Sequence, residues 1–161
     1  MDWQTFWHAW EALATTSLVV IGSWQISAIR REAKKERTLE ACDRYVTDPL
    51  IDACTRTLRD AHLSGEFLKN RKTFRSDVVN LLNYLDGIAI GIAQNLYIDS
   101  LARDHLQHIV EKHCEEYLKQ PDLTELDVRM KDFEHLIALR ERWTPAPKVD
   151  YRDGFAKWRR K

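Results

Sequence analysis

A 20-residue stretch near the N-terminus, Trp10 to Ile29, constrains the fold more than any other feature of the chain. It contains one ionisable side chain, Glu11, and five basic residues follow it within eight positions. As a helix it would be about 30 Å long, roughly the thickness of the hydrocarbon core of a bilayer. The sequence therefore predicts a transmembrane helix with a short external tip over residues 1–29.

The basic residues that follow the stretch predict its orientation, because positive charges are retained on the cytoplasmic side of a membrane helix. We expect a single-pass protein of the cell inner membrane, with its N-terminus outside and its C-terminus in the cytoplasm. A cleaved signal peptide fits poorly, since its basic residues would precede the apolar segment. A soluble amphipathic helix is a second alternative, because the stretch is only moderately apolar. The cluster expected to contact membrane lipid consists of Arg30, Arg31, Lys34, Lys35 and Arg37.

Polar and small residues of the predicted span fall on one helical face with heptad spacing. A polar stripe in lipid is costly unless it faces protein or water, and small residues let helices approach closely. We therefore expect a homo-oligomer, with a tetramer as one candidate. The face is either a dry packed interface or the lining of a pore, and a monomeric anchor is the remaining alternative. This seam consists of His8, Glu11, Thr15, Leu18, Gly22 and Gln25.

The remaining chain predicts an all-α cytoplasmic bundle over residues 30–143. Only 5 Gly and 4 Pro occur among 161 residues, which favours long helices. The membrane helix is expected to continue to Thr47, and Asp48 with Pro49 begins a helix that reaches about Leu63. Further helices are expected over residues 74–96, 99–119 and 122–143, joined by short loops. Residues 144–161 form a basic C-terminal tail.

One segment of the bundle, Val78 to Leu106, carries a distinctive pattern. It reads LLN, an aromatic residue and an acid, then IAIGI, a turn, and Asp99 at the start of the next helix. It resembles a bacterial family of unknown function whose members combine one membrane helix with a small helical domain. Some of these resemble membrane effectors of anti-phage defence, such as the channel subunit of Hailong-type systems. The resemblance implies a homo-oligomeric ion channel gated by a nucleotide or oligonucleotide, with a nucleotidyltransferase as partner.

A second group of basic residues, with Phe67 and Phe74 among them, is the candidate ligand site. Such cations bind phosphates, and such aromatic rings stack on bases. The alternative interpretation is a solvated loop. The group consists of Arg56, Arg59, Lys69, Arg71, Lys72 and Arg75.

The sequence contains no motif of a common enzyme class, neither a P-loop nor GxGxxG, GxSxG or HExxH. We therefore predict that the chain is not an enzyme and uses no catalytic residue, metal or cofactor. Three separated cysteines without a CxxC pair are interpreted as reduced thiols. An acidic helix face is interpreted as solvated, because no E-x-x-H accompanies it. That face consists of Asp104, His108, Glu111 and Glu115.

Together these features predict a homo-oligomeric membrane effector, an ion channel of anti-phage defence whose cytoplasmic domain binds a nucleotide or oligonucleotide. The alternative is a membrane-tethered helical adaptor that recruits a protein partner. Such an adaptor needs neither conductance nor a small ligand.

Overall fold

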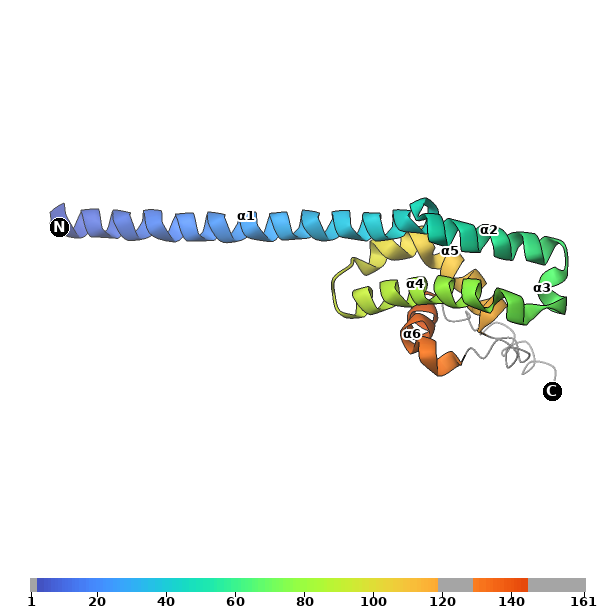
Figure 1. Ribbon diagram of the computed structural model, residues 1–161. Coiled ribbons are helices and arrows are strands. Elements are labelled where there is room, and N and C mark those ends of the chain that lie inside the picture. The colour runs from blue at the N-terminus through green and yellow to red at the C-terminus, as the bar shows by residue number, and fades with distance from the viewer. Residues whose placement is uncertain (1–2, 119–128, 145–161) are drawn as a thin grey trace, which may run out of the picture.

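The computed structural model describes residues 3–118 and 129–144 of the chain (Figure 1). Within these ranges the protein folds into six α-helices and two short 3-10 segments, with no β-strand. The predicted all-α class is therefore confirmed. One long helix projects from a small bundle formed by the other five (Figure 1).

Helix α1 spans Trp3–Thr47, 45 residues without a break. At 1.5 Å per residue it is about 68 Å long. Its C-terminal third packs on the bundle, while its N-terminal part extends away from it (Figure 1). The predicted continuity of the N-terminal stretch with residues up to Thr47 is confirmed. The helix ends there because Pro49 cannot donate a backbone hydrogen bond and biases the residue before it away from helical geometry.

No helix in the described part of the chain is both long and apolar enough to cross a membrane. The predicted transmembrane segment over residues 10–29 lies within α1.

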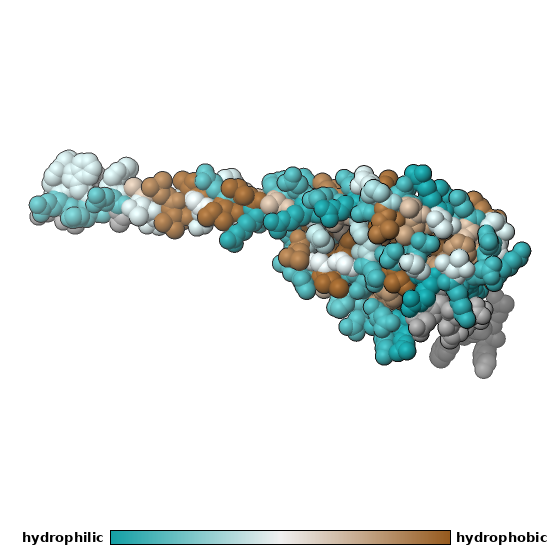
Figure 2. All heavy atoms as spheres, viewed as in Figure 1, coloured by the Kyte–Doolittle hydropathy of each residue, from teal (hydrophilic) through white to brown (hydrophobic). Residues whose placement is uncertain are grey.

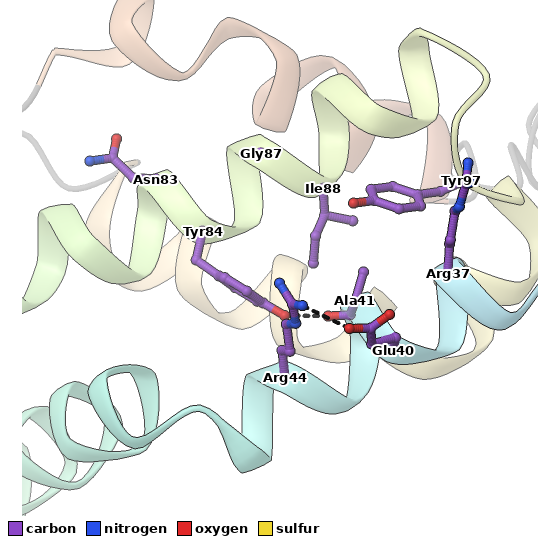
Figure 3. Close-up of a pocket in the computed structure, with 9 residues that line it drawn as sticks. All are labelled: Arg37, Glu40, Ala41, Arg44, Asn83, Tyr84, Gly87, Ile88 and Tyr97. Atoms are coloured by element: carbon purple, nitrogen blue, oxygen red, sulfur yellow. Dashed lines mark hydrogen bonds and ion pairs between the residues drawn. The ribbon is translucent and has the colours of Figure 1, made fainter. Parts of the chain in front are cut away.

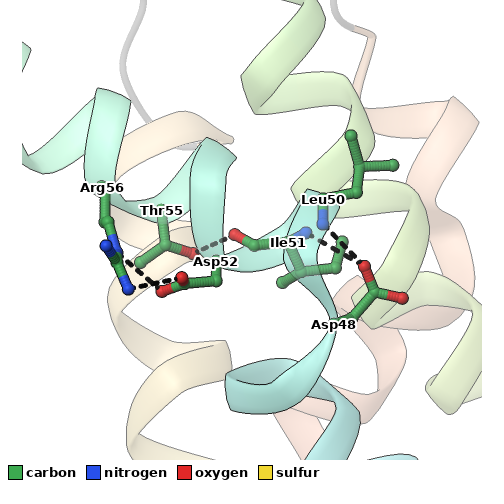
Figure 4. A network of polar contacts seen from close by, with 6 residues as sticks. All are labelled: Asp48, Leu50, Ile51, Asp52, Thr55 and Arg56. Atoms are coloured by element: carbon green, nitrogen blue, oxygen red, sulfur yellow. Dashed lines mark hydrogen bonds and ion pairs between the residues drawn. The ribbon is translucent and has the colours of Figure 1, made fainter.

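Helix α2, Pro49–Leu63, starts at the predicted position. One carboxylate oxygen of Asp48 accepts hydrogen bonds from the backbone N–H groups of Leu50, at 2.9 Å, and Ile51, at 3.3 Å (Figure 4). One turn later, Asp52 and Arg56 form an ion pair of 2.7 Å. Asp48 therefore satisfies two N–H groups that the first helical turn leaves without partners.

The connection after α2 contains more structure than the sequence predicted. Helix α3, Glu66–Lys69, and the 3-10 segment η1, Arg71–Phe74, occupy it. Gly65 provides the left-handed turn (φ 71°) that leads into α3. The Phe67 side chain is 2% exposed, and its ring stacks on His62 with ring centroids 4.3 Å apart. This burial folds the segment against the bundle, so the expectation of a plain loop was wrong.

Helix α4, Arg75–Ala93, corresponds to the helix predicted over residues 74–96, and its apolar side chains form the middle of the core. It ends three residues earlier than expected. Asn95 adopts a left-handed conformation (φ 60°), and the N–H groups of Leu96 and Tyr97 both donate to the Gly91 carbonyl, at 2.8 and 3.3 Å. Such a turn closes a helix by satisfying its last carbonyl groups.

Helix α5, Asp99–Tyr117, begins at the expected residue. Helix α6, Glu134–Trp143, follows the 3-10 segment η3, Met130–Phe133. The predicted helix over 122–143 was therefore wrong at residues 129–133, while residues 119–128 lie outside the described ranges. The start of α6 is set by tertiary contacts, because Phe133 is buried and Asp86 of α4 accepts a 2.9 Å hydrogen bond from the Leu136 N–H. The predicted basic tail beyond residue 144 also lies outside the described ranges.

Candidate functional site

The projecting part of α1 exposes a large apolar surface that nothing in the described chain covers. Figure 2 shows apolar residues gathered along the middle of the projection, with hydrophilic residues at its tip and where it meets the bundle. A contiguous exposed apolar patch of this kind marks an interaction surface with protein or lipid. The large side chains that are at least half exposed are Trp3, Trp7, Trp10, Leu13, Leu18, Val19, Val20, Ile21, Trp24, Ile26 and Ile29.

The predicted seam lies on this same projection. His8 and Glu11 lie 3.9 Å apart, and both side chains are more than 80% exposed. No atom lies within 4 Å of the position that a Cβ would take at Gly22. The amide of Gln25 is exposed and makes no hydrogen bond within the described residues. The seam is therefore an open face that other molecules can reach.

Hydroxyl groups on the projection form hydrogen bonds within α1, unlike the amide of Gln25. The side chains of Thr15, Ser17, Ser23 and Ser27 donate to the carbonyl four residues earlier, at 2.8–2.9 Å. These polar groups are satisfied within the helix itself. Glu11 and Gln25 therefore remain as the seam side chains that most need partners from outside the helix.

The C-terminal part of α1, residues 34–47, is tied to the bundle, and we call it the root. Lys34 donates a hydrogen bond to the Asn95 side chain in the turn after α4. The hydroxyl of Thr38 is 1% exposed and accepts a 2.9 Å hydrogen bond from the Ile98 N–H just before α5. The Tyr84 hydroxyl donates to the Ala41 carbonyl. The root is thus bonded to helix α4 and to the turn that connects α4 with α5.

Two members of the predicted lipid-contacting cluster belong to this junction. Lys34 bonds Asn95, and Arg37 lines a pocket between α1 and α4. Arg30, Arg31 and Lys35 are exposed on α1, where contact with lipid stays a prediction.

We call the pocket beside the root the junction pocket, and it has a volume of about 380 Å³ (Figure 3). Figure 3 shows Arg37 and Tyr97 at one end, Arg44 and Tyr84 at the other, and the Asn83 side chain directed away from them. Burial raises the pKa of Tyr84 to about 12, so this phenol stays protonated. The pocket is lined by Arg37, Glu40, Ala41, Arg44, Asn83, Tyr84, Gly87, Ile88 and Tyr97.

The two arginines of the junction pocket differ in their partners. Arg44 forms a 2.7 Å ion pair with Glu40 one helical turn earlier. Arg37 forms no ion pair with any residue that the structure describes, and it is exposed. The Tyr97 hydroxyl likewise makes no hydrogen bond within the described residues. The pocket therefore contains one guanidinium group without an ion pair and one phenol without a hydrogen bond to any described residue, and the Tyr97 hydroxyl is directed away from Arg37, toward Ile88 (Figure 3).

A second pocket lies between the end of α1, helix α2 and helix α5, and its polar groups bond one another. The Tyr45 hydroxyl lies 2.9 Å from Nε2 of His113, and Nε2 of His62 lies 3.3 Å from the Tyr117 hydroxyl. Burial, helped by the charge of Lys112 and by His62, lowers the pKa of His113 to about 4. His113 is therefore neutral at pH 7.

The basic residues predicted to bind a ligand lie on α2, α3, η1 and the start of α4, and their binding of a ligand stays a prediction. Arg56 is paired with Asp52 on the outside of α2, and Arg59 alone of the six lines one of the two pockets. The other four, Lys69, Arg71, Lys72 and Arg75, follow one another along α3, η1 and the start of α4. The density of basic residues along the sequence was the reason for choosing this group. The sequence did not identify Arg44, Tyr84 and Tyr97 of the junction pocket as candidate site residues.

Other residues singled out by sequence have structural partners. Asp99 accepts hydrogen bonds from the Trp143 indole, at 2.8 Å, and from Arg142, at 3.1 Å. On the acidic face, Glu115 pairs with Arg140 at 3.1 Å. No group of three or more His, Cys, Asp or Glu side chains in the described ranges is placed to hold a metal ion. The thiols of Cys42, Cys54 and Cys114 are buried.

The fold and these sites define a small all-α protein in which a tight helical bundle carries a long, exposed N-terminal helix. The chain belongs to the DUF4760 family, a domain of unknown function, whose model matches residues 12–143. The match includes most of the projection as well as the bundle. No curated protein matches the chain, and no solved structure does.

Proposed function

We propose that this protein is a homo-oligomeric membrane effector that conducts ions. The α1 helices of several copies assemble in a bilayer with their seams facing inward, while the bundles lie on the cytoplasmic side and bind a regulatory ligand. The single observation that carries the proposal is the projecting face of α1. It exposes apolar side chains along roughly 30 residues and carries one polar seam.

The distribution of side chains on α1 supports assembly instead of a lone helix. Lipid solvates the apolar side chains, but it does not solvate Glu11 or Gln25. Neighbouring copies or a column of water between them would satisfy both groups. The hydroxyl groups away from the seam need no such partner, because each already donates to its own helix. The seam hydroxyl of Thr15 is satisfied in the same way, so Glu11 and Gln25 are the seam groups that an inward-facing arrangement would satisfy.

The charge distribution supports the orientation proposed for the inner membrane, with the N-terminus outside. Arg30, Arg31 and Lys35 are exposed between the apolar part of α1 and the bundle. At that level they would meet anionic lipid headgroups on the cytoplasmic side. The resemblance to channel subunits of anti-phage systems supports a defence role, a nucleotide or oligonucleotide ligand and a nucleotidyltransferase partner.

Flotation with vesicles tests the membrane part of the proposal. The purified full chain, reconstituted into liposomes of phosphatidylethanolamine and phosphatidylglycerol, is expected to float with them and to release an entrapped cation indicator. Protein left at the bottom of the gradient would contradict membrane association. Flotation without ion flux under any condition would favour the tethered adaptor.

Matched substitutions on α1 test the seam. Gln25→Leu is expected to abolish flux while the protein still floats, because it removes a polar side chain from the proposed pore. Ser23→Leu is the control, since it adds the same side chain on another face of the same helix turn. Equal flux in both variants and in the parent would remove the seam from the conducting path.

Disulfide cross-linking tests the geometry of assembly independently of conductance. Thr15→Cys places a thiol on the seam, and Leu13→Cys places one about 160° away around the helix. The three native thiols are buried. Under mild oxidation in liposomes, the Thr15→Cys chain is expected to form dimers faster. Faster dimer formation by Leu13→Cys would place a different face at the interface.

A further inference from the structure

The junction pocket combines the groups needed to hold a small ligand that carries both a planar ring and an anion. One end of the pocket has the Arg37 guanidinium, which forms no ion pair with a described carboxylate, and the Tyr97 ring extends from there along the pocket with its hydroxyl directed toward Ile88 (Figure 3). Its floor is apolar, formed by Ala41, Gly87 and Ile88. Charge-assisted hydrogen bonds to guanidinium are among the strongest that phosphates make, and aromatic rings stack on planar bases.

The size and charge of the pocket fit a ligand of about one nucleotide. A volume of about 380 Å³ lies at the small end of the range for ligand pockets. Arg44 is already paired with Glu40, so only one cation is free to take a phosphate. An oligonucleotide would bring further phosphates for which the pocket offers no unpaired cation.

The junction pocket is a better candidate than the pocket between α2 and α5. There, Lys112 lies 3.9 Å from Glu116, and Arg59 lies 4.0 Å from Asp60. Its phenols and imidazoles are also bonded to one another. An anion entering that pocket would meet cations that already have carboxylate neighbours, whereas the junction pocket, which Glu40 also lines, has in Arg37 a cation without an ion pair to any described residue.

We propose that the junction pocket binds a single mononucleotide between the root of α1 and the wall formed by α4 and Tyr97. This inference rests on the proposed function, for which it supplies the regulatory site. The root contributes Arg37 to the pocket and the α4–α5 turn contributes Tyr97. A ligand held by both favours one position of the root relative to the bundle, because binding shifts a conformational equilibrium by its differential affinity.

Calorimetric titration of the full chain in detergent tests the site with a panel of purine and pyrimidine mononucleotides, with inorganic phosphate as a separate probe. At least one mononucleotide is expected to bind saturably and much more tightly than phosphate alone. Absence of binding by every mononucleotide would overturn the proposal. Equal binding of inorganic phosphate would also overturn it, since it would show an anion site that does not recognise a base.

Two variants and one control locate the binding. Arg37→Gln is expected to weaken mononucleotide binding by at least about tenfold, because a charge-assisted hydrogen bond contributes about 1.5–3 kcal/mol. Gly87→Leu is expected to abolish it by filling the pocket, and the space above Gly87 is open, with no atom within 4 Å of an added Cβ. Lys35→Gln removes an exposed charge from the same helix outside the pocket and is expected to leave affinity within about twofold.

The variants also separate this inference from the proposed function. Thermal unfolding verifies that each one is folded, and the disulfide cross-linking of Thr15→Cys measures assembly without any ligand. Unchanged affinity in both Arg37→Gln and Gly87→Leu would place the ligand elsewhere, whatever the assembly assay shows. Loss of binding together with intact assembly is the expected result. Failure of assembly with binding intact would refute the pore and leave the nucleotide site standing.

Discussion

The hydroxyl of Tyr45, near the end of α1, lies 2.9 Å from Nε2 of His113 in the middle of α5. His113 is 5% exposed, and its ring stacks on Tyr117 with the two planes 15° apart. Its other nitrogen, Nδ1, lies 3.5 Å from the Glu116 carboxylate, too loosely placed for a hydrogen bond. The Tyr45 hydroxyl is thus the one close polar partner of a buried imidazole in the described structure.

Tyr45→Phe is expected to lower the free energy of unfolding by about 1–3 kcal/mol, because it leaves a buried imidazole nitrogen unsatisfied. Urea denaturation of the full chain measures the loss. Tyr97→Phe is the matched control, since the Tyr97 hydroxyl makes no hydrogen bond within the described residues. A stability loss in Tyr97→Phe as large as that in Tyr45→Phe would contradict the assignment.

Protonation of His113 is expected to make the protein less stable in mild acid. Burial, helped by the charge of Lys112 and by His62, lowers the pKa of His113 to about 4, whereas an unfolded histidine has a pKa of about 6.5. Between these values the unfolded chain binds a proton that the folded chain does not, so stability falls as the pH falls from about 6.5 to about 4. The loss reaches at most about 3 kcal/mol.

The contribution of His113 is isolated by comparison with a variant that cannot titrate. His113→Phe is expected to show a smaller fall in the free energy of unfolding between pH 7 and pH 4.5 than the parent chain. Urea denaturation at both pH values provides the comparison. Identical pH dependence in the two proteins would show that another group causes the acid sensitivity.

Two glycines of α4 are expected to respond in opposite directions to alanine. A Cβ at Gly91 would overlap Cδ2 and Cε2 of Tyr97, whereas a Cβ at Gly87 would meet no atom within 4 Å. Gly91→Ala should therefore cost about 1–3 kcal/mol through displacement of the Tyr97 ring. Gly87→Ala should stabilise the helix by up to about 1 kcal/mol. Thermal unfolding measures both, and destabilisation by Gly87→Ala would contradict the open space seen there.

Removal of the cap at the corner between α1 and α2 is expected to destabilise the protein. Asp48→Ala deletes the acceptor for the N–H groups of Leu50 and Ile51 (Figure 4) and should cost about 1 kcal/mol. Asp48→Asn keeps an acceptor oxygen and should cost much less. Equal losses in the two variants, measured by urea denaturation, would argue against the role of this hydrogen-bonded cap.

Local signals in the sequence predicted the helices well wherever chain-local chemistry decides their ends. Asp48 and Pro49 placed the corner after α1, and Asp99 placed the start of α5. These local signals did not predict the helix ends that depend on tertiary contacts. Burial of Phe67 folds the segment after α2, and the Asp86 carboxylate on α4 helps fix where α6 begins.

The candidate site was harder to predict than the fold for a related reason. Arg37 follows an apolar stretch and was interpreted as a lipid contact, although the structure places it in the junction pocket. Tyr97 reaches the same pocket only because Asn95 turns the chain through a left-handed conformation. No spacing in the sequence links residues 60 positions apart across such a turn. Clusters of charge along the chain, by contrast, are visible in the sequence, but only Arg59 of the predicted ligand-binding group lines one of the two pockets.

Because α1 is unbroken, a rotation about its attachment to the bundle at Lys34 and Thr38 would move the whole projecting part as one body. The free arm, from Trp3 to about Ala33, is about 45 Å long. A tilt of about 10° at Lys34 and Thr38 would displace Trp3 sideways by about 8 Å, because the helix transmits the rotation with little bending. Sub-ångström adjustments around Ile98 and Asn95 would thus be magnified at the far end, where the tryptophans lie.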